Sequence, residues 1–262
     1  MNLLFIGDIV GSGGRAAVRQ LVPDLRTELH ASFVIANAEN CAAGNGMTAR
    51  CLQEMMPAVD VFTAGDHVWD QKGFDAEVRT LDNVIRPANV AAAQPGRGCG
   101  VFTNPAGGEV AVITLMGRTF MRDNADDPFA AADRLLAGLP SSVKTIFVDF
   151  HAEATSEKIA MGYYLEGRVT AVIGTHTHVP TADGVVLPKG TAYQSDAGMV
   201  GAVRSVLGRE VDDVLAKFTT GMPNRLKVVE TGPIRFDAVL VSYDYRTGRA
   251  EAIQPVHREY TV

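Results

Sequence analysis

The chain has 262 residues, of which 47% are hydrophobic and 21% are charged. This length and apolar content can bury a large core, so wholesale disorder is excluded. The formal net charge of −6 argues against non-specific binding of DNA or RNA, which depends on many lysine and arginine contacts to phosphates. We therefore expect any phosphate-bearing ligand to be held locally, by metal ions.

The start of the chain and its cysteines predict a cytoplasmic protein. The apolar run at residues 2–6 is soon interrupted by Gly7 and Asp8, which makes it too short for a signal peptide. No stretch approaches the roughly 18 apolar residues of a membrane span, so we expect no membrane association. The three cysteines form no C-x-x-C pair, and this fits a reducing compartment. The sequence leaves open whether the chain forms a homo-oligomer.

Through the first two thirds of the chain, β-branched and aromatic runs alternate with helical patterns. The runs predict strands buried on both faces, at residues 2–6, 33–36, 61–64, 110–115, 145–150 and 169–173. The helical patterns predict helices between them, the first disturbed by Pro23, at residues 15–30, 48–56, 128–137 and 156–166. This alternation favours an α/β fold.

The rest of the chain has a different pattern. Residues 89–108 are rich in Ala, Gly and Pro and predict a loop with one short strand. Beyond residue 180 we expect one helix at 211–218 and antiparallel strands at 184–187, 191–194, 236–243 and 250–254. Because no convincing linker divides the sequence, residues 1–262 are expected to form a single domain.

Five of the predicted strands end in similar polar residues. In open α/β sheets, ligands bind just beyond the carboxyl ends of the strands. Four of the six histidines in the chain lie at these ends, each close to Asp, Glu or Gly. The polar segments are Gly7-Asp8, Asn37-Ala38-Glu39-Asn40, Gly65-Asp66-His67, His151 and Gly174-Thr175-His176-Thr177-His178. We therefore expect one site built from all five.

The residue types at these ends predict a pair of metal ions. Carboxylates with neutral imidazoles suit first-row divalent metals, and the lack of thiolates argues against a structural zinc site. Two ions about 3.5–4 Å apart need a bridging carboxylate and roughly seven or eight ligands. A set of that size is present: Asp8, Glu39, Asn40, Asp66, His151, His176 and His178. In an extended segment His176 and His178 would lie on the same side and could serve different ions. His67 remains as a candidate general acid.

Each of these residues also has an ordinary interpretation when taken alone. Asp8 could be a turn residue, and His151 could be a satisfied core histidine. The His176-Thr177-His178 pair is the strongest individual signal for metal binding. Five coincidences at equivalent strand ends are less plausible than one site, so the joint pattern favours the metal centre.

A rival motif follows the first strand. Residues 11–16 match G-x-G-x-x-A, the dinucleotide-binding fingerprint. The acidic residue expected about 20 positions further on is missing, because Asn37 stands there and Glu39 lies beyond it. The fingerprint also explains none of the histidines. We expect instead that these glycines form a loop that turns the chain behind Asp8 and offers N–H groups to the substrate.

These motifs resemble those of the calcineurin-like metallophosphoesterases. Gly65-Asp66-His67 is similar to that family's G-N-H-[DE] motif, and Thr175-His176-Thr177-His178 is similar to its G-H-x-H motif. The usual D-x-H start lacks its histidine here, because Asp8-Ile9-Val10 stands in its place. The segments that depart from the general pattern look like the YmdB-type family over almost the whole chain, at residues 8–11, 37–40, 149–158 and 174–183.

The resemblance implies a four-layer αββα sandwich and a phosphodiesterase that acts on 2′,3′-cyclic nucleotides, notably 2′,3′-cyclic AMP. A metal-bridging hydroxide would attack phosphorus, and His67 would donate the proton. Glu39 would bridge the ions, one held with Asp8, Asn40 and His178 and the other with Asp66, His151 and His176. Asp66 stands where the family usually has Asn; the added charge would favour metal binding but weaken the Lewis acidity that the substrate meets.

The remaining expectations concern the cofactors, the substrate contacts and the competing functions. Fe or Mn is the preferred metal, and Zn would also fit. The helix that starts near Thr155 could direct N–H groups at the phosphate, and Phe120, Met121 and Tyr193 are candidates to stack on a base. A phosphomonoesterase or nucleotidase remains an alternative enzyme. A metal-stabilised regulatory protein with weak catalysis is the alternative from another class.

Overall fold

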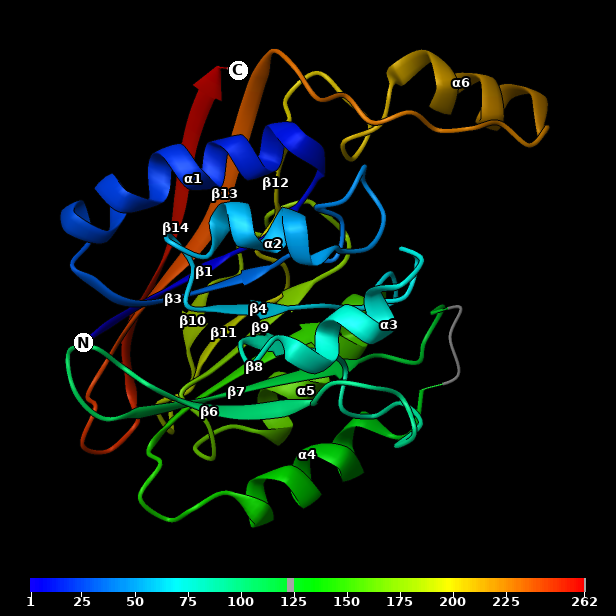
Figure 1. The fold of residues 1–262 in the computed structure, drawn as a ribbon. Helices are drawn as coiled ribbons and strands as arrows, with labels where there is room; N and C mark the ends of the chain where they lie inside the picture. Colours follow the sequence, from blue (N-terminus) through cyan, green and yellow to red (C-terminus); the bar gives the residue numbers. More distant parts are fainter. Residues whose placement is uncertain (122–124, 262) are drawn as a thin grey trace.

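The computed structural model describes residues 1–121 and 125–261, which form two β-sheets packed face to face (Figure 1). The first sheet contains β1 (Asn2–Ile6), β2 (Asp8–Ile9), β3 (Ala31–Asn37), β4 (Val61–Thr63), β5 (Val84–Ile85), β12 (Met199–Ala202), β13 (Pro233–Tyr243) and β14 (Ala250–Thr261). The second contains β6 (Cys99–Thr103), β7 (Glu109–Met116), β8 (Thr145–His151), β9 (Ala171–Thr175), β10 (Val185–Val186) and β11 (Ala192–Gln194).

Each sheet combines a set of four parallel strands with antiparallel strands. The first runs in the order β2-β12-β13-β1-β3-β4-β5, with β14 paired to β13, and the second runs β10-β11-β9-β8-β7-β6. Strands β1, β3, β4 and β5 are parallel to one another, as are β7, β8, β9 and β11. The carboxyl ends of each parallel set therefore lie at one edge of its sheet.

Helices cover the outer face of each sheet. The helices are α1 (Gly11–Glu28), α2 (Ala49–Met55), α3 (Phe74–Glu77), α4 (Pro128–Gly138), α5 (Thr155–Tyr164) and α6 (Val211–Thr220), with a 3₁₀ turn, η1 (Val78–Thr80). In Figure 1, α1 and α2 lie above the first sheet, α4 and α5 lie on the far side of the second, and α6 projects from the body. No helix of the described residues is long and apolar enough to cross a membrane.

Alternating side chains explain the layers. In β1, Leu4 and Ile6 pack into the core under α1 and α2, whereas Leu3 and Phe5 pack between the sheets. Phe5 meets Phe147 of β8 there, with ring centroids 4.7 Å apart. A third core, which includes Phe150, lies between the second sheet and α4 and α5. Because successive strand residues face opposite sides, these runs build helix, sheet, sheet and helix layers, and the predicted αββα sandwich is confirmed.

The glycine-rich segment after β2 differs from the predicted loop. Its residues form the first turn of α1, and the N–H of Gly11 donates to the carbonyl of Asn40 at 3.0 Å. A Cβ on Gly14 would lie 2.4 Å from the carbonyl oxygen of Val200, so glycine lets the helix pack closely against β12. These glycines serve packing, so the expected loop is wrong, and the expectation that this segment offers N–H groups to the substrate stays a prediction.

Candidate metal centre

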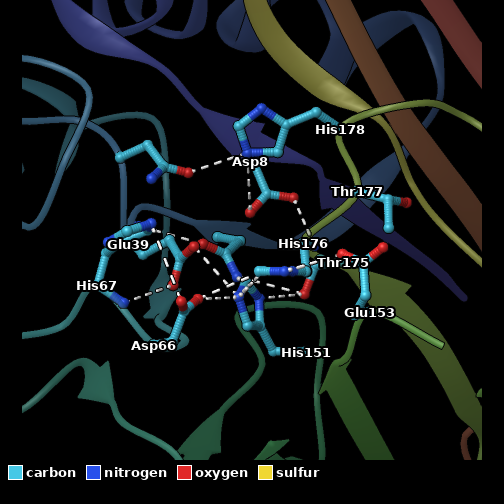
Figure 2. A network of polar contacts seen from close by, with 12 residues as sticks. Asp8, Glu39, Asp66, His67, His151, Glu153, Thr175, His176, Thr177 and His178 are labelled. Carbon is cyan, nitrogen blue, oxygen red and sulfur yellow. Dashed lines mark hydrogen bonds and ion pairs between the residues drawn. The ribbon is translucent and has the colours of Figure 1, made fainter. Parts of the chain in front are cut away.

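The functional residues predicted from the sequence meet where the carboxyl ends of the two sheets lie side by side. Strand β2 and the segments after β3 and β4 supply Asp8, Glu39, Asn40, Asp66 and His67 from the first sheet. The second sheet supplies His151, the last residue of β8, and His176 and His178 after β9. Figure 2 shows most of these side chains pointing toward one another. The site therefore belongs to both sheets.

Four of these side chains form a candidate metal-binding group. One ligand atom from each of Glu39, Asp66, His151 and His176 lies within 4.8 Å of the others. The Nε2 atom of His151 is 3.2 Å from Oε1 of Glu39 and 3.0 Å from Oδ1 of Asp66. The Nδ1 atom of His176 is 3.3 Å from the same Asp66 oxygen. Two carboxylates and two imidazoles are a donor set that suits Mn, Fe or Zn.

A second group adjoins the first. The Nε2 atom of His178 lies 3.1 Å from Oδ1 of Asn40 and 3.9 Å from Oδ1 of Asp8. Within the described part of the chain, Oδ1 of Asp8 and Oε1 of Glu39 are buried and accept no hydrogen bond. Because a buried carboxylate oxygen that accepts no hydrogen bond is costly, these atoms are ones that a cation would satisfy. The residues present therefore fit metal ions.

The ionisation of the cluster follows from its burial and its internal charges. Burial raises the pKa of Asp8 well above its usual value. Burial is also the largest single influence on Glu39, but the charge and the hydrogen bond of His151, together with the charge of His67, outweigh it, and the pKa of Glu39 is lowered. Burial lowers the pKa of His178 to about 4. His178 is therefore neutral at pH 7, which is the form that binds a metal.

A buried chain of hydrogen bonds fixes the tautomer of His151. The hydroxyl of Thr175 donates to Asp149 at 2.7 Å and lies 2.9 Å from Nδ1 of His151. Because that hydroxyl has one proton, it must accept from Nδ1–H, and a neutral ring then keeps its Nε2 lone pair for the cluster. Asp149 also accepts from Asn37 and Thr63. The sequence interpretation missed Asp149, although it stands two residues before His151 and therefore on the same face of β8.

The turn that carries the last two histidines is not extended, so the predicted same-side arrangement is wrong. His176 has φ 94° and His178 has φ 63°, in the left-handed region that side chains other than glycine seldom adopt. The two rings diverge, one toward His151 and Asp66 and the other toward Asn40 and Asp8. The two histidines thus reach different groups of side chains, and the expectation that they serve different ions stays a prediction.

Asp196 holds that turn in place. One of its carboxylate oxygens accepts from the N–H of Thr177 at 3.1 Å, from the Thr177 hydroxyl at 2.7 Å and from Nζ of Lys158 at 2.8 Å. The other accepts from the N–H of Gly198 at 2.8 Å. Lys158 is only 2% exposed, so the ion pair is buried and well provided with hydrogen bonds. The sequence interpretation assigned no role to either residue of the pair.

His67 lies at the rim of the cluster and lines two cavities. Its side chain is 31% exposed, and its Nδ1 lies 2.7 Å from Oδ2 of Asp70. One cavity, of about 440 Å³, is lined by His67 together with Glu39, Asn40, His178 and residues near α6. The other, of about 350 Å³, is lined by Asp66, His67, Phe120, Met121, Glu153 and His176. His67 can therefore meet a ligand held in either cavity.

The four candidate substrate contacts are placed differently. Phe120 and Met121 line the smaller cavity beside His67. Thr155 is the exposed first residue of α5, two positions after the cavity residue Glu153. Tyr193 is only 5% exposed and its hydroxyl lies 2.7 Å from Oγ of Ser195. It packs on the outer face of the second sheet, apart from the cluster.

Fold and site together define a phosphoesterase-like protein. The fold is similar to that of the calcineurin-like phosphoesterase YfkN from Bacillus subtilis, with a TM-score of 0.53 and 12% identity over 100% of this chain and 90% of that chain. The chain belongs to the YmdB-like protein family, whose model matches residues 4–256.

Two further relatives resemble the chain more strongly. It is 43% identical to a protein of Bacillus subtilis strain 168 named 2′,3′-cyclic-nucleotide 2′-phosphodiesterase, over 98% of this chain and 96% of that protein. A solved structure described as a novel phosphatase from Mycoplasma pneumoniae has a TM-score of 0.92 and 29% identity, and covers 100% of this chain and 94% of that one. The family predicted from the sequence is confirmed.

The role of Asp196 can be tested at Thr177, which touches it from the turn itself. Thr177→Val keeps the side-chain shape but removes the hydroxyl that donates to the carboxylate, whereas Thr177→Ser keeps that hydroxyl. Loss of a contact that orients ligands typically weakens metal binding roughly 10–100-fold. We expect Thr177→Val to lower the affinity for Mn²⁺ by a factor in that range, measured by competition with a chelator. The Mn²⁺ affinity of Thr177→Ser should stay close to that of the parent protein. Equal affinity in both variants, with unchanged circular dichroism, would contradict this role.

Proposed function

We propose that this protein is a phosphodiesterase that uses two metal ions to hydrolyse small cyclic nucleotides, with 2′,3′-cyclic AMP as its preferred substrate. The observation that carries the proposal is the buried cluster of carboxylates and imidazoles, which opens on the cavities at His67. The Bacillus subtilis relative named 2′,3′-cyclic-nucleotide 2′-phosphodiesterase, 43% identical over 98% of this chain, supports the reaction. The phosphodiesterase activity predicted from the sequence agrees with that name.

The proposed ligand sets follow the two groups of contacts. Glu39 contacts the first group through Oε1, which lies 3.2 Å from Nε2 of His151, and it stands next to Asn40 of the second group in the chain. Glu39 is therefore the proposed bridge. It would share one ion with Asp8, Asn40 and His178 and the other with Asp66, His151 and His176. Fe or Mn is preferred, and Zn fits as well, because the donors are oxygen and imidazole nitrogen without thiolate. When bound, such ions activate a water molecule as nucleophile and offset charge on the phosphoryl oxygens.

His67 is the proposed general acid. Its Nδ1 pairs with Asp70, which orients the ring and leaves Nε2 to carry the proton that is transferred. The same Asp70 carboxylate accepts a hydrogen bond from Asn45 at 3.1 Å. This second contact restrains the His67–Asp70 pair. The ribose oxygen that leaves phosphorus needs a proton, and His67 stands where both cavities meet to supply it.

The competing nucleotidase activity has one observation in its favour, since the Mycoplasma pneumoniae neighbour is described as a phosphatase. The charge of the cavities argues against it. Glu153 lines both cavities, and its side chain is 48% exposed. A carboxylate there repels the dianion of a monoester more than the single charge of a diester.

Substrate preference tests the proposal directly. We expect kcat/KM of the metal-loaded protein for 2′,3′-cyclic AMP to exceed that for adenosine monophosphates at least about tenfold, since charge repulsion of ~1.4 kcal/mol suffices for that factor. Glu153→Gln should reduce this difference in kcat/KM by raising the activity toward the monoester. A higher kcat/KM for the monophosphates would favour the nucleotidase. Absence of turnover on every nucleotide tested would favour the regulatory alternative.

The role of His67 can be separated from metal binding through the leaving group. His67→Ala should keep its metal content yet lose roughly 10²–10⁴-fold in rate on 2′,3′-cyclic AMP. The loss should be far smaller on bis-p-nitrophenyl phosphate, because p-nitrophenolate leaves without a proton. Equal losses on both substrates would mean that His67 positions the phosphate. If His67→Ala lost one ion, His67 would be a metal ligand, and Asp66 would need a new role.

A further inference from the structure

The proposed metal cluster has a cavity on each of two sides. The cavities have volumes of about 440 and 350 Å³ and share His67, Glu153 and His176 as lining residues. Each volume alone falls within the roughly 300–1,000 Å³ of a small-molecule site. A phosphate at the shared residues would therefore have room for a substituent on either side.

Each cavity also has one strongly exposed phenylalanine in its wall. Phe218 of α6 is 77% exposed in the larger cavity, and Phe120 is 85% exposed in the smaller one. Most of the other wall residues near α6 are apolar: Val206, Leu207, Val214 and Leu226. Exposed aromatic faces of this kind stack on nucleobases, and any base can be accepted.

Hydrogen bonds hold the backbone before Phe120 and the segments that flank α6, the helix that carries Phe218. Glu157, in the first turn of α5, accepts from the N–H groups of Arg118 at 3.0 Å and Thr119 at 3.2 Å, directly before Phe120. On the other side, Arg209 donates to the carbonyls of Gly44 at 2.7 Å and Leu226 at 3.1 Å, which ties the segments flanking α6 to the loop after β3. The two walls are therefore built parts of the site.

A 2′,3′-cyclic nucleotide has one nucleoside on its phosphorus and would occupy only one of these cavities. We infer that the site also cleaves an acyclic phosphodiester with a nucleoside on each side of phosphorus, such as a 3′,5′-linked dinucleoside monophosphate. This inference rests on the proposed function, because it requires the phosphate to bind at the shared residues. The single charge and neutral bases of such a ligand suit these walls, whereas a net charge of −6 disfavours long nucleic acids.

The chemistry is the same hydrolysis with a different leaving group. The oxygen of a water molecule forms a bond to phosphorus, and one P–O ester bond breaks. The leaving ribose oxygen takes a proton, which His67 can supply at the junction of the cavities. The products are one nucleoside and one nucleoside monophosphate, so no oxidant or further reactant is needed.

The test compares adenylyl-3′,5′-adenosine with 2′,3′-cyclic AMP on the metal-loaded full chain. We expect turnover of the dinucleoside monophosphate, and we expect Phe120→Ala and Phe218→Ala each to lower its kcat/KM by roughly 5–150-fold, the effect of losing one base stack. Phe218→Ala should lower kcat/KM for the dinucleoside monophosphate at least about fivefold more than kcat/KM for the cyclic nucleotide. Leu215→Ala and Tyr163→Ala are matched controls, because both side chains are exposed but line neither cavity among the described residues.

Each outcome separates this inference from the proposed function. Cleavage of 2′,3′-cyclic AMP without cleavage of the dinucleoside monophosphate would overturn the inference and leave the proposed function intact. Cleavage of the dinucleoside monophosphate that is unchanged by Phe218→Ala, or changed equally by Leu215→Ala, would also overturn it. Loss of turnover on both substrates would overturn the proposed function itself.

Discussion

Two carboxylates, Asp8 and Glu39, are fully buried at the place where the ends of two sheets meet. Removing such a charge from water costs several kcal/mol in a protein interior, so the site depends on compensating positive charge. Bound metal ions would supply that charge, and neither sheet alone provides their ligands: the first sheet provides the acids, and the second provides His151, His176 and His178. The αββα arrangement therefore determines the chemistry, because only face-to-face packing of the sheets brings these strand ends together.

The residues around the cluster act mainly by fixing imidazoles. One segment, residues 149–158, contributes at four points, and each contact is a hydrogen bond or ion pair with a distant part of the chain. Asp149 orients the ring of His151 through Thr175, and His151 supplies that ring. Glu157 anchors the backbone before Phe120, and Lys158 neutralises Asp196. The backbone of the His176–His178 turn lies in a region that costs of order 1–3 kcal/mol per residue, and the buried Lys158–Asp196 pair restrains it.

The sequence predicted the features that are local. Buried strands appear as apolar runs, and a polar residue just after such a run marks a strand end, so the seven proposed ligands could be named. Contacts between distant segments left no local signal. Strands β2 and β12 are only 2 and 4 residues long, too short to show as apolar runs. The ion pair joins Lys158 and Asp196, which are 38 residues apart in the sequence. Tyr193 was placed near the substrate on residue type alone, whereas the pleat of β11 turns it to the outer face. The left-handed turn at His176 depends on Asp196 and could not be read from the motif.

The central claim is that two metal ions share Glu39, and metal content in crystals of Glu39→Gln tests it most directly. A neutral amide bridges two ions poorly, so both ions should fall together to low occupancy, while the parent protein binds close to two ions per chain. Anomalous diffraction at the metal edges, combined with elemental analysis, measures both positions separately. Full occupancy of both positions in Glu39→Gln, or no more than one ion in the metal-replete parent protein, would contradict the shared centre.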